Sequence, residues 1–182
     1  MPRLILFNGP PACGKSTLAQ RYVDEHPLAL NLDVDRLRSL IGRWRDDPHA
    51  AGLLARELAL AAARAHLASE HDVVVPQFLG RATFIEQLEC LARQAGATFH
   101  EVVLLDSKEN ILRRFAERSR AAVDAAHVEA HEMIERSDGF EDLSVMYDRL
   151  MAVIAARPGA RIVHVAEGKV DVTYQAVLRN LV

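Results

Sequence analysis

The sequence is poor in the features that mark several large classes of protein. Its 182 residues include only two cysteines, Cys13 and Cys90, whose spacing suits neither a disulfide framework nor a metal site. No apolar run approaches the roughly 20 residues that a membrane-spanning helix needs. The chain also enters a strand-like segment directly after Met-Pro-Arg, without a signal-peptide pattern. We therefore expect a cytoplasmic protein that has no membrane partner.

An excess of charge of one sign is also lacking. The chain has 22 Lys and Arg residues against 25 Asp and Glu residues, a formal net charge of -3. This balance gives no general attraction to a polyanion, and no basic surface with interleaved aromatic residues is evident. Nucleic acid is therefore disfavoured as a partner. The eight histidines show no HExxH or comparable metal-ligand spacing, so a zinc site is disfavoured too.

What the sequence does contain is an alternation of short apolar runs with stretches of helical periodicity. This alternation predicts an α/β fold built on a parallel sheet, and the hydrophobic content of 50% is enough for one core. No long linker divides the chain, so residues 1–182 are expected to form a single domain. The expected strands are 4–8, 28–32, 72–76, 100–105 and 161–165. The expected helices are 15–25, 34–41, 49–69, 81–94, 108–119, 127–136, 143–156 and 172–181.

The glycine-rich turn after the first strand carries the strongest functional signal. It reads Gly-Pro-Pro-Ala-Cys-Gly-Lys-Ser and matches the Walker A phosphate-binding motif between a buried strand and an amphipathic helix. The glycines let backbone amides approach a phosphate, Lys15 would reach the β- and γ-phosphates, and the Ser16 hydroxyl would ligate Mg²⁺. Cys13 is read as a small residue that fills the loop rather than as a redox switch. The predicted cofactors are ATP and Mg²⁺, held by Gly9, Pro10, Pro11, Ala12, Cys13, Gly14, Lys15, Ser16 and Thr17.

Charged side chains gather where the second strand turns into a helix. Asp33, Asp35, Arg36 and Arg38 lie within six residues of one another. A carboxylate can accept the proton of an attacking hydroxyl, and a guanidinium can hold an anionic group, so this cluster suits phosphoryl transfer. An Asp at a helix start can also serve only as an N-cap. For Asp33 both roles stay open.

Three further segments offer candidate residues with two readings each. Gln77, Phe78 and Arg81 follow the third strand and line either an acceptor pocket or an ordinary loop. After the fourth strand, Asp106 or Ser107 is placed to cap a helix. Arg114 and Arg118 lie four apart on one face of that helix, which is either a plain solvated face or a cationic site for polyphosphate. Trp44 either stacks on an acceptor ring or covers the core.

These motifs resemble the P-loop small-molecule kinases related to chloramphenicol phosphotransferase and zeta toxins, together with the AAA-type kinases grouped near them. The resemblance implies a P-loop NTPase three-layer sandwich with a helical lid, here around residues 114–137. It gives Asp35 the role of base for an acceptor hydroxyl, places Arg38 on the group's frequent arginine, and makes Arg114 and Arg118 lid residues that contact ATP. It also puts adenine near residues 165–168.

The third strand departs from the group's pattern. Many relatives have an Asp where this chain has the neutral Gln77, and the preceding Val-Pro stretch looks like that of tunicamycin-resistance ATP-binding proteins. The leading prediction is a kinase that phosphorylates a hydroxyl of a small molecule such as an antibiotic or another metabolite. The alternatives are a non-catalytic ATP-dependent ligand-binding or resistance protein and, less favoured, a nucleic-acid end kinase. Predicted catalytic residues are Lys15, Asp35, Arg38, Arg114 and Arg118, and predicted substrate residues are Asp33, Asp35, Arg38, Gln77 and Arg81.

Overall fold

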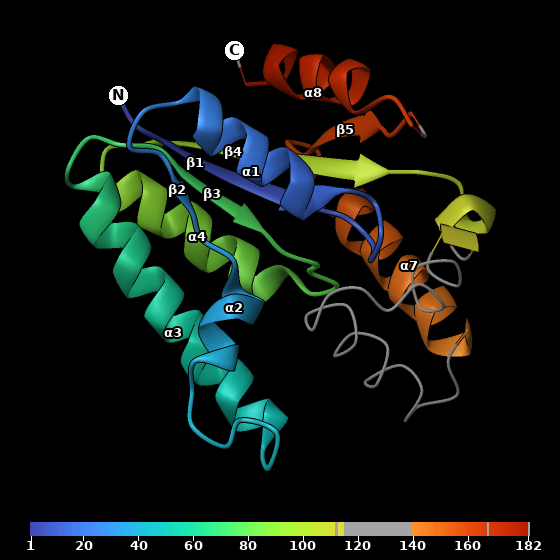
Figure 1. Ribbon diagram of the computed structural model, residues 1–182, viewed down its shortest axis with the longest axis horizontal. Coiled ribbons are helices and arrows are strands. Elements are labelled where there is room, and N and C mark those ends of the chain that lie inside the picture. Colours follow the sequence, from blue (N-terminus) through green and yellow to red (C-terminus); the bar gives the residue numbers. More distant parts are fainter. Residues whose placement is uncertain (112, 115–139, 167, 182) are drawn as a thin grey trace.

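The computed structural model describes residues 1–111, 113–114, 140–166 and 168–181 (Figure 1). The predicted helix 127–136, the predicted lid apart from Arg114, and Arg118 lie outside the described residues. Residues 108–111, 113 and 114 are helical, in line with the helix expected from residue 108.

A five-stranded sheet organises the described part of the chain, and all of its strand pairs are parallel. The strand order is β2-β3-β1-β4-β5, so the chain builds β2 and β3 on one side of the central strand β1 and then crosses to β4 and β5 on the other side. Such a reversal opens a crevice at the carboxyl ends of the strands, where open α/β sheets place their ligands. The predicted parallel α/β sheet is confirmed. The strands are β1 (Arg3–Asn8), β2 (Leu30–Asn31), β3 (Val73–Pro76), β4 (Thr98–Leu105) and β5 (Arg161–His164).

Helices cover both faces of the sheet and complete the predicted three layers (Figure 1). Because side chains alternate along a strand, Ile5 and Phe7 of β1 pack towards α1 and α8, whereas Leu4 and Leu6 pack towards α3 and α4. Helix α7 packs on the α3 and α4 side, where Leu150 meets Val103 of β4. The helices are α1 (Lys15–Glu25), α2 (Val34–Ser39), α3 (Pro48–Leu67), α4 (Ala82–Gln94), α7 (Phe140–Ala155) and α8 (Val170–Arg179).

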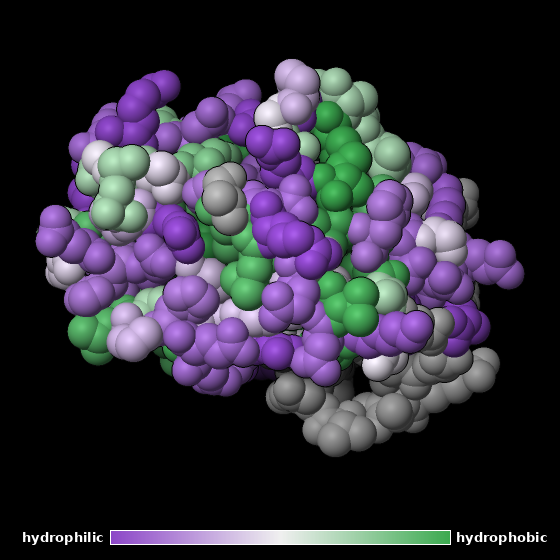
Figure 2. Space-filling view, turned by 90° about the horizontal axis from the view of Figure 1, so that it is seen from above, coloured by the Kyte–Doolittle hydropathy of each residue, from purple (hydrophilic) through white to green (hydrophobic). Residues whose placement is uncertain are grey.

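One face of the molecule, seen from above, is mostly polar. Hydrophilic side chains cover much of this face, and separate hydrophobic patches interrupt them (Figure 2). None of the helices within the described residues is both long and apolar enough to cross a membrane.

Candidate nucleotide and acceptor site

The turn between β1 and α1 requires glycine for two different physical reasons. A Cβ on Gly9 would lie 2.5 Å from the carbonyl oxygen of Leu104 and 2.8 Å from Cys13 Sγ, so there is no room for a side chain. Gly14 has open space around it, but its φ of 92° lies in the region that L side chains rarely adopt. Cys13 is 1% exposed and packs in the core with the residues of β1 and α1. This burial agrees with its reading as a loop-filling residue.

The start of α1 is left open towards an anion. Its N-cap is Gly14, which offers no side-chain cap, and its first turn contains no acidic residue. The first amides of the helix therefore remain available, and the positive end of the helix dipole favours negative charge there. Ser16 and Thr17 are exposed in this first turn.

Lys15 reaches back across the loop. Its Nζ donates to the carbonyl oxygens of Gly9 and Pro10, each at 2.8 Å. An ammonium group has three N–H donors, and among the described residues Nζ makes, beside these two carbonyls, only a long contact of 3.8 Å with Cys13 Sγ. The third donor can therefore bind a β- or γ-phosphate oxygen while the loop carbonyls stay bound.

The loop can supply only part of the ligands that Mg²⁺ needs, and water and phosphate oxygens would supply the rest. Among the described residues, no group of three or more His, Cys, Asp or Glu side chains is arranged to hold a metal ion. The exposed Ser16 hydroxyl is a hard oxygen ligand, and Mg²⁺ typically takes few protein ligands beside water and phosphate oxygens. Ser16 is therefore the residue that would hold it.

Asp33 caps helix α2. Its Oδ1 accepts from the backbone amides of Asp35 at 2.9 Å and of Arg36 at 3.3 Å. Burial raises the pKa of the Asp33 carboxyl above its ordinary value, and the two amides oppose this rise. The capping role left open by the sequence is therefore present, whereas a contact of Asp33 with substrate stays a prediction.

Asp35 is held at both carboxylate oxygens. Arg38 Nη2 lies 3.4 Å from Oδ1, and Gln77 Nε2 donates to Oδ2 at 3.3 Å. The Asp35 side chain is nevertheless 52% exposed, so it stays open to a substrate. The structure thus brings together three of the predicted acceptor residues, from α2 and from the segment after β3.

Two polar atoms beside Asp35 have no partner within the described residues. Arg38 Nε and Gln77 Oε1 are both buried and lack a hydrogen bond. A buried unpaired polar atom is costly, and a ligand or water normally satisfies it. One of these atoms is a donor and the other an acceptor, so together they suit a ligand that offers both kinds of group.

Trp44 covers the core beneath this cluster. The guanidinium groups of Arg38 and Arg45 lie over its ring, at 4.7 and 4.6 Å from the centroid, and the residue is 9% exposed. Cation–π contacts with two arginines engage the indole. Of the two readings for Trp44, the structure therefore favours the core cover over the stacking surface.

Within the described residues, Arg38 and Gln77 contact the Asp35 carboxylate and Arg81 does not. It is exposed at the N-cap position of α4, where it makes no side-chain cap bond. Its predicted contact with substrate therefore has no support from the geometry and stays a prediction.

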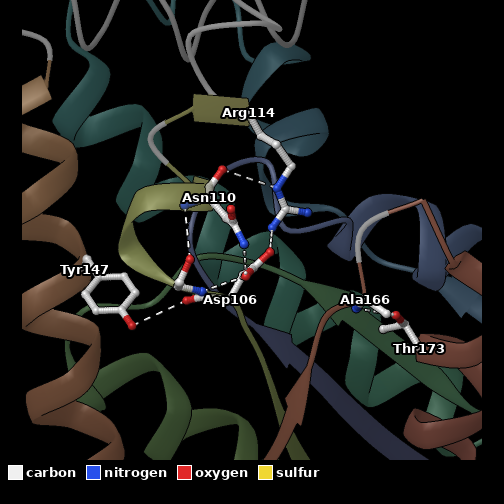
Figure 3. A network of polar contacts seen from close by, with 7 residues as sticks. Asp106, Asn110, Arg114, Tyr147, Ala166 and Thr173 are labelled. Atoms are coloured by element: carbon white, nitrogen blue, oxygen red, sulfur yellow. Dashed lines mark hydrogen bonds and ion pairs between the residues drawn. The ribbon is translucent and has the colours of Figure 1, made fainter.

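Arg114 is engaged by an acid at the end of β4 (Figure 3). It forms an ion pair with Asp106, and the side chains of the two are 13% and 9% exposed. Asp106 also accepts from the backbone amide of Ser107 at 2.6 Å and from Asn110 Nδ2 at 2.9 Å. The helix itself is capped by Ser107, whose Oγ accepts from the Asn110 amide at 3.2 Å. The charge of Asp106 offsets that of Arg114, so a contact of Arg114 with ATP would be weaker while this ion pair is closed.

The segment after β5 is stabilised by a side chain from α8 (Figure 3). The Ala166 amide donates to Thr173 Oγ1 at 3.2 Å, and Thr173 is 3% exposed. Gly168 has a φ of 69°, which a residue with a side chain rarely adopts. Contact between adenine and this segment stays a prediction.

Sequence reasoning missed Asn8, the last residue of β1. It is fully buried, and its Oδ1 accepts from the amides of Gly9 at 2.8 Å and Leu79 at 2.9 Å. Its Nδ2 donates to the Leu79 carbonyl at 3.2 Å. A polar residue at the end of the apolar run Leu-Ile-Leu-Phe, directly before the glycine-rich turn, was the signal that could have found it.

Fold and loop together define a P-loop nucleotide-binding protein with a kinase-like fold. More particularly, the chain belongs to the AAA domain family, whose model matches residues 4–143. An adenylate kinase from Deinococcus radiodurans is 31% identical over 131 residues, and this match spans 66% of both chains, just under two thirds of that relative. The resemblance expected from the sequence is thereby confirmed at the level of the family.

Solved structures confirm the fold along nearly the whole chain. A candidate kinase from Chloroflexus aurantiacus has a TM-score of 0.65 at 18% identity and covers 99% of this chain and 96% of its own. The tunicamycin resistance protein of Deinococcus radiodurans has a TM-score of 0.60 at 17% identity, with coverage of 98% and 95%. At these identities the likeness concerns the fold alone.

Proposed function

We propose that the protein is an ATP- and Mg²⁺-dependent phosphotransferase that acts on a hydroxyl group of a small molecule, with Asp35 as the general base. One observation carries the proposal. Asp35 is half exposed, and Arg38 and Gln77 orient its two oxygens at the end of the sheet where the phosphate-binding loop also lies. A base in this position suits a neutral acceptor that must lose a proton on attack.

In this reaction the acceptor oxygen forms a bond to the γ-phosphorus as the bond from that phosphorus to the β–γ bridging oxygen breaks. The acceptor proton passes to Asp35, and ADP leaves. Lys15 and the amides at the start of α1 would hold the phosphate oxygens, and Ser16 would hold Mg²⁺, which would offset their charge. The contribution of the protein is mainly positioning and electrostatics.

A second candidate function follows from the sequence relative, which is named an adenylate kinase. In that case the acceptor would be the phosphate of a nucleoside monophosphate, and no base would be required. The unpaired Arg38 Nε would suit such an anion. The Asp35 carboxylate, 3.4 Å from Arg38, offsets that positive charge and favours the neutral acceptor instead.

The test is a screen of the purified protein with labelled ATP and Mg²⁺ against small hydroxyl compounds and AMP, followed by mass spectrometry. A phosphate monoester formed by the wild type and not by Lys15→Met supports the proposal. Formation of ADP from AMP would replace it with the adenylate kinase reading. Tight binding of a compound without any phosphorylated product would favour the non-catalytic alternative.

A further inference from the structure

A chain of contacts joins the nucleotide loop to the candidate base through Asn8. Lys15 Nζ binds the Gly9 carbonyl, and the Gly9 amide donates to Asn8 Oδ1. The same oxygen accepts from the Leu79 amide. Leu79 follows Gln77 by two residues, and Gln77 is the residue that donates to Asp35.

The Asn8 side chain is held in place by its hydrogen bonds. The residue is 0% exposed, and both of its amide atoms are engaged, the oxygen twice and the nitrogen once. The O and N assignment is fixed by chemistry, since two backbone N–H groups face the oxygen and a carbonyl faces the nitrogen. Asn8 therefore connects Leu79, in the segment 77–81, to Gly9, the first residue of the phosphate-binding loop.

The Gly9 end of this chain is the part that nucleotide contacts. Lys15 Nζ holds the Gly9 carbonyl and, with three N–H donors, can bind a phosphate oxygen as well. A Cβ on Gly9 would lie 2.5 Å from the Leu104 carbonyl oxygen, so the loop packs closely against the end of β4 at this residue. A phosphate bound at Lys15 therefore restrains Gly9, whose amide shares its acceptor, Asn8 Oδ1, with the Leu79 amide.

We propose that Asn8 is a positioning residue that couples occupancy of the phosphate-binding loop to the order of residues 77–81, and through Gln77 to the orientation of Asp35. The description of 77–81 as the acceptor side rests on the proposed function, but the coupling itself does not. It can be measured with Mg²⁺ and a non-hydrolysable ATP analogue alone, so the two ideas fail separately.

Hydrogen exchange of the wild type with and without Mg·AMPPNP gives the first measurement. The Leu79 amide is expected to exchange at least fivefold more slowly with the analogue bound, at the same half-saturating concentration as the Gly9 amide. The amide of Leu88, in the middle of α4, serves as the reference and keeps its rate. An unchanged rate at Leu79 under saturating analogue would overturn the proposal without any variant.

Asn8→Asp gives the second measurement. It keeps an oxygen for the two amides but replaces the donor to the Leu79 carbonyl with a second acceptor. We expect AMPPNP affinity within threefold of the wild type by calorimetry, and loss of the ligand-dependent slowing at Leu79. The matched control is Tyr22→Phe, which removes the 2.6 Å hydrogen bond to Asp72 at the other end of the sheet. Equal slowing in Asn8→Asp and in the control would show that Asn8 is only a structural residue.

Discussion

Gln77 donates its Nε2 to Asp35 Oδ2 at 3.3 Å and so joins the end of β3 to the start of α2. Where the kinase group often has a second acid, this chain has a neutral amide that orients the first acid. The neutral residue raised the question of a non-catalytic protein. Its contact with Asp35 orients that carboxylate, which fits the proposed reaction.

Substitution of this amide is expected to slow phosphoryl transfer. Gln77→Glu replaces the donor with a carboxylate that repels Asp35, and a hydrogen bond to a charged group contributes about 1.5–3 kcal/mol. We expect transfer to fall roughly tenfold or more, because 1.36 kcal/mol corresponds to a factor of ten in rate. The measurement is kcat with the acceptor found by the screen. Gln94→Glu, an exposed change on α4, is the control, and equal rates for the two variants would contradict the role given to Gln77.

Removal of the Lys15 ammonium tests the phosphate-binding loop. Lys15→Met should lower the affinity for Mg·AMPPNP by about a hundredfold, as expected for the loss of charge-assisted contacts to phosphate. Calorimetry measures the effect. The control is Lys108→Met, since Lys108 pairs on the surface with Asp148 at 3.0 Å. Unchanged binding by Lys15→Met would mean that the loop does not hold the triphosphate.

The ion pair between Asp106 and Arg114 predicts competition with nucleotide. If Arg114 binds ATP, Asp106→Asn should release it and strengthen Mg·AMPPNP binding about fivefold, a change of about 1 kcal/mol. Asparagine keeps a side-chain oxygen for the Ser107 amide. The double variant Asp106→Asn with Arg114→Ala should lose this gain. An equal gain in the double variant would remove Arg114 from the nucleotide site.

A buried ion pair away from the site predicts a pH-dependent stability. Arg157 contacts the buried Glu101 at 2.6 Å and Glu89 at 2.8 Å. Burial raises the pKa of Glu101, and Arg157 opposes that rise. Arg157→Met leaves the carboxylate unpaired, so it should destabilise the protein by about 3 kcal/mol at pH 8.

The direction in which stability changes with pH follows from the coupling of proton binding to folding. A raised pKa means that the folded state holds its proton more tightly than the unfolded state, so stability falls as the pH rises through the pKa of the folded state. Arg157→Met removes the group that opposes the rise, so it raises the pKa of Glu101 further. The loss of stability caused by Arg157→Met should therefore be smaller at pH 5 than at pH 8. Urea unfolding at the two pH values checks this. Arg93→Met, an exposed change on α4, should show no such dependence, and a loss in Arg157→Met that is equal at both pH values would refute the explanation.

Local patterns were enough to predict the central part of the fold. Helix α1 has the predicted bounds, and β1 differs from its predicted bounds by one residue, because a buried strand, a glycine turn and an amphipathic helix each leave a local signature. The edge strand β2 is shorter than expected, since Leu28 adopts a φ of 61° and the chain turns there. Strand β4 begins earlier, at Thr98, because it pairs with Arg3.

The contacts that make the site were harder to predict. Asp35 and Gln77 are 42 residues apart, and Asn8 and Leu79 are 71 residues apart. Residue type and spacing can identify each of these residues separately. Which residues contact one another depends on the strand order, which brings the ends of β1, β2 and β3 to one edge of the sheet. The family resemblance also implied a contact between Arg114 and ATP, without revealing the ion pair between Arg114 and Asp106.

Asp35 is proposed to remove the proton of the acceptor, and single-turnover transfer from labelled ATP measures this role. Asp35→Asn keeps the size of the side chain but cannot take up the proton, and loss of a general base typically costs a factor of about 10² to 10⁴. We predict that Asp35→Asn binds Mg·AMPPNP within about threefold of the wild type and transfers at least about a hundredfold more slowly. Transfer at the wild-type rate by Asp35→Asn would show that Asp35 is not the base.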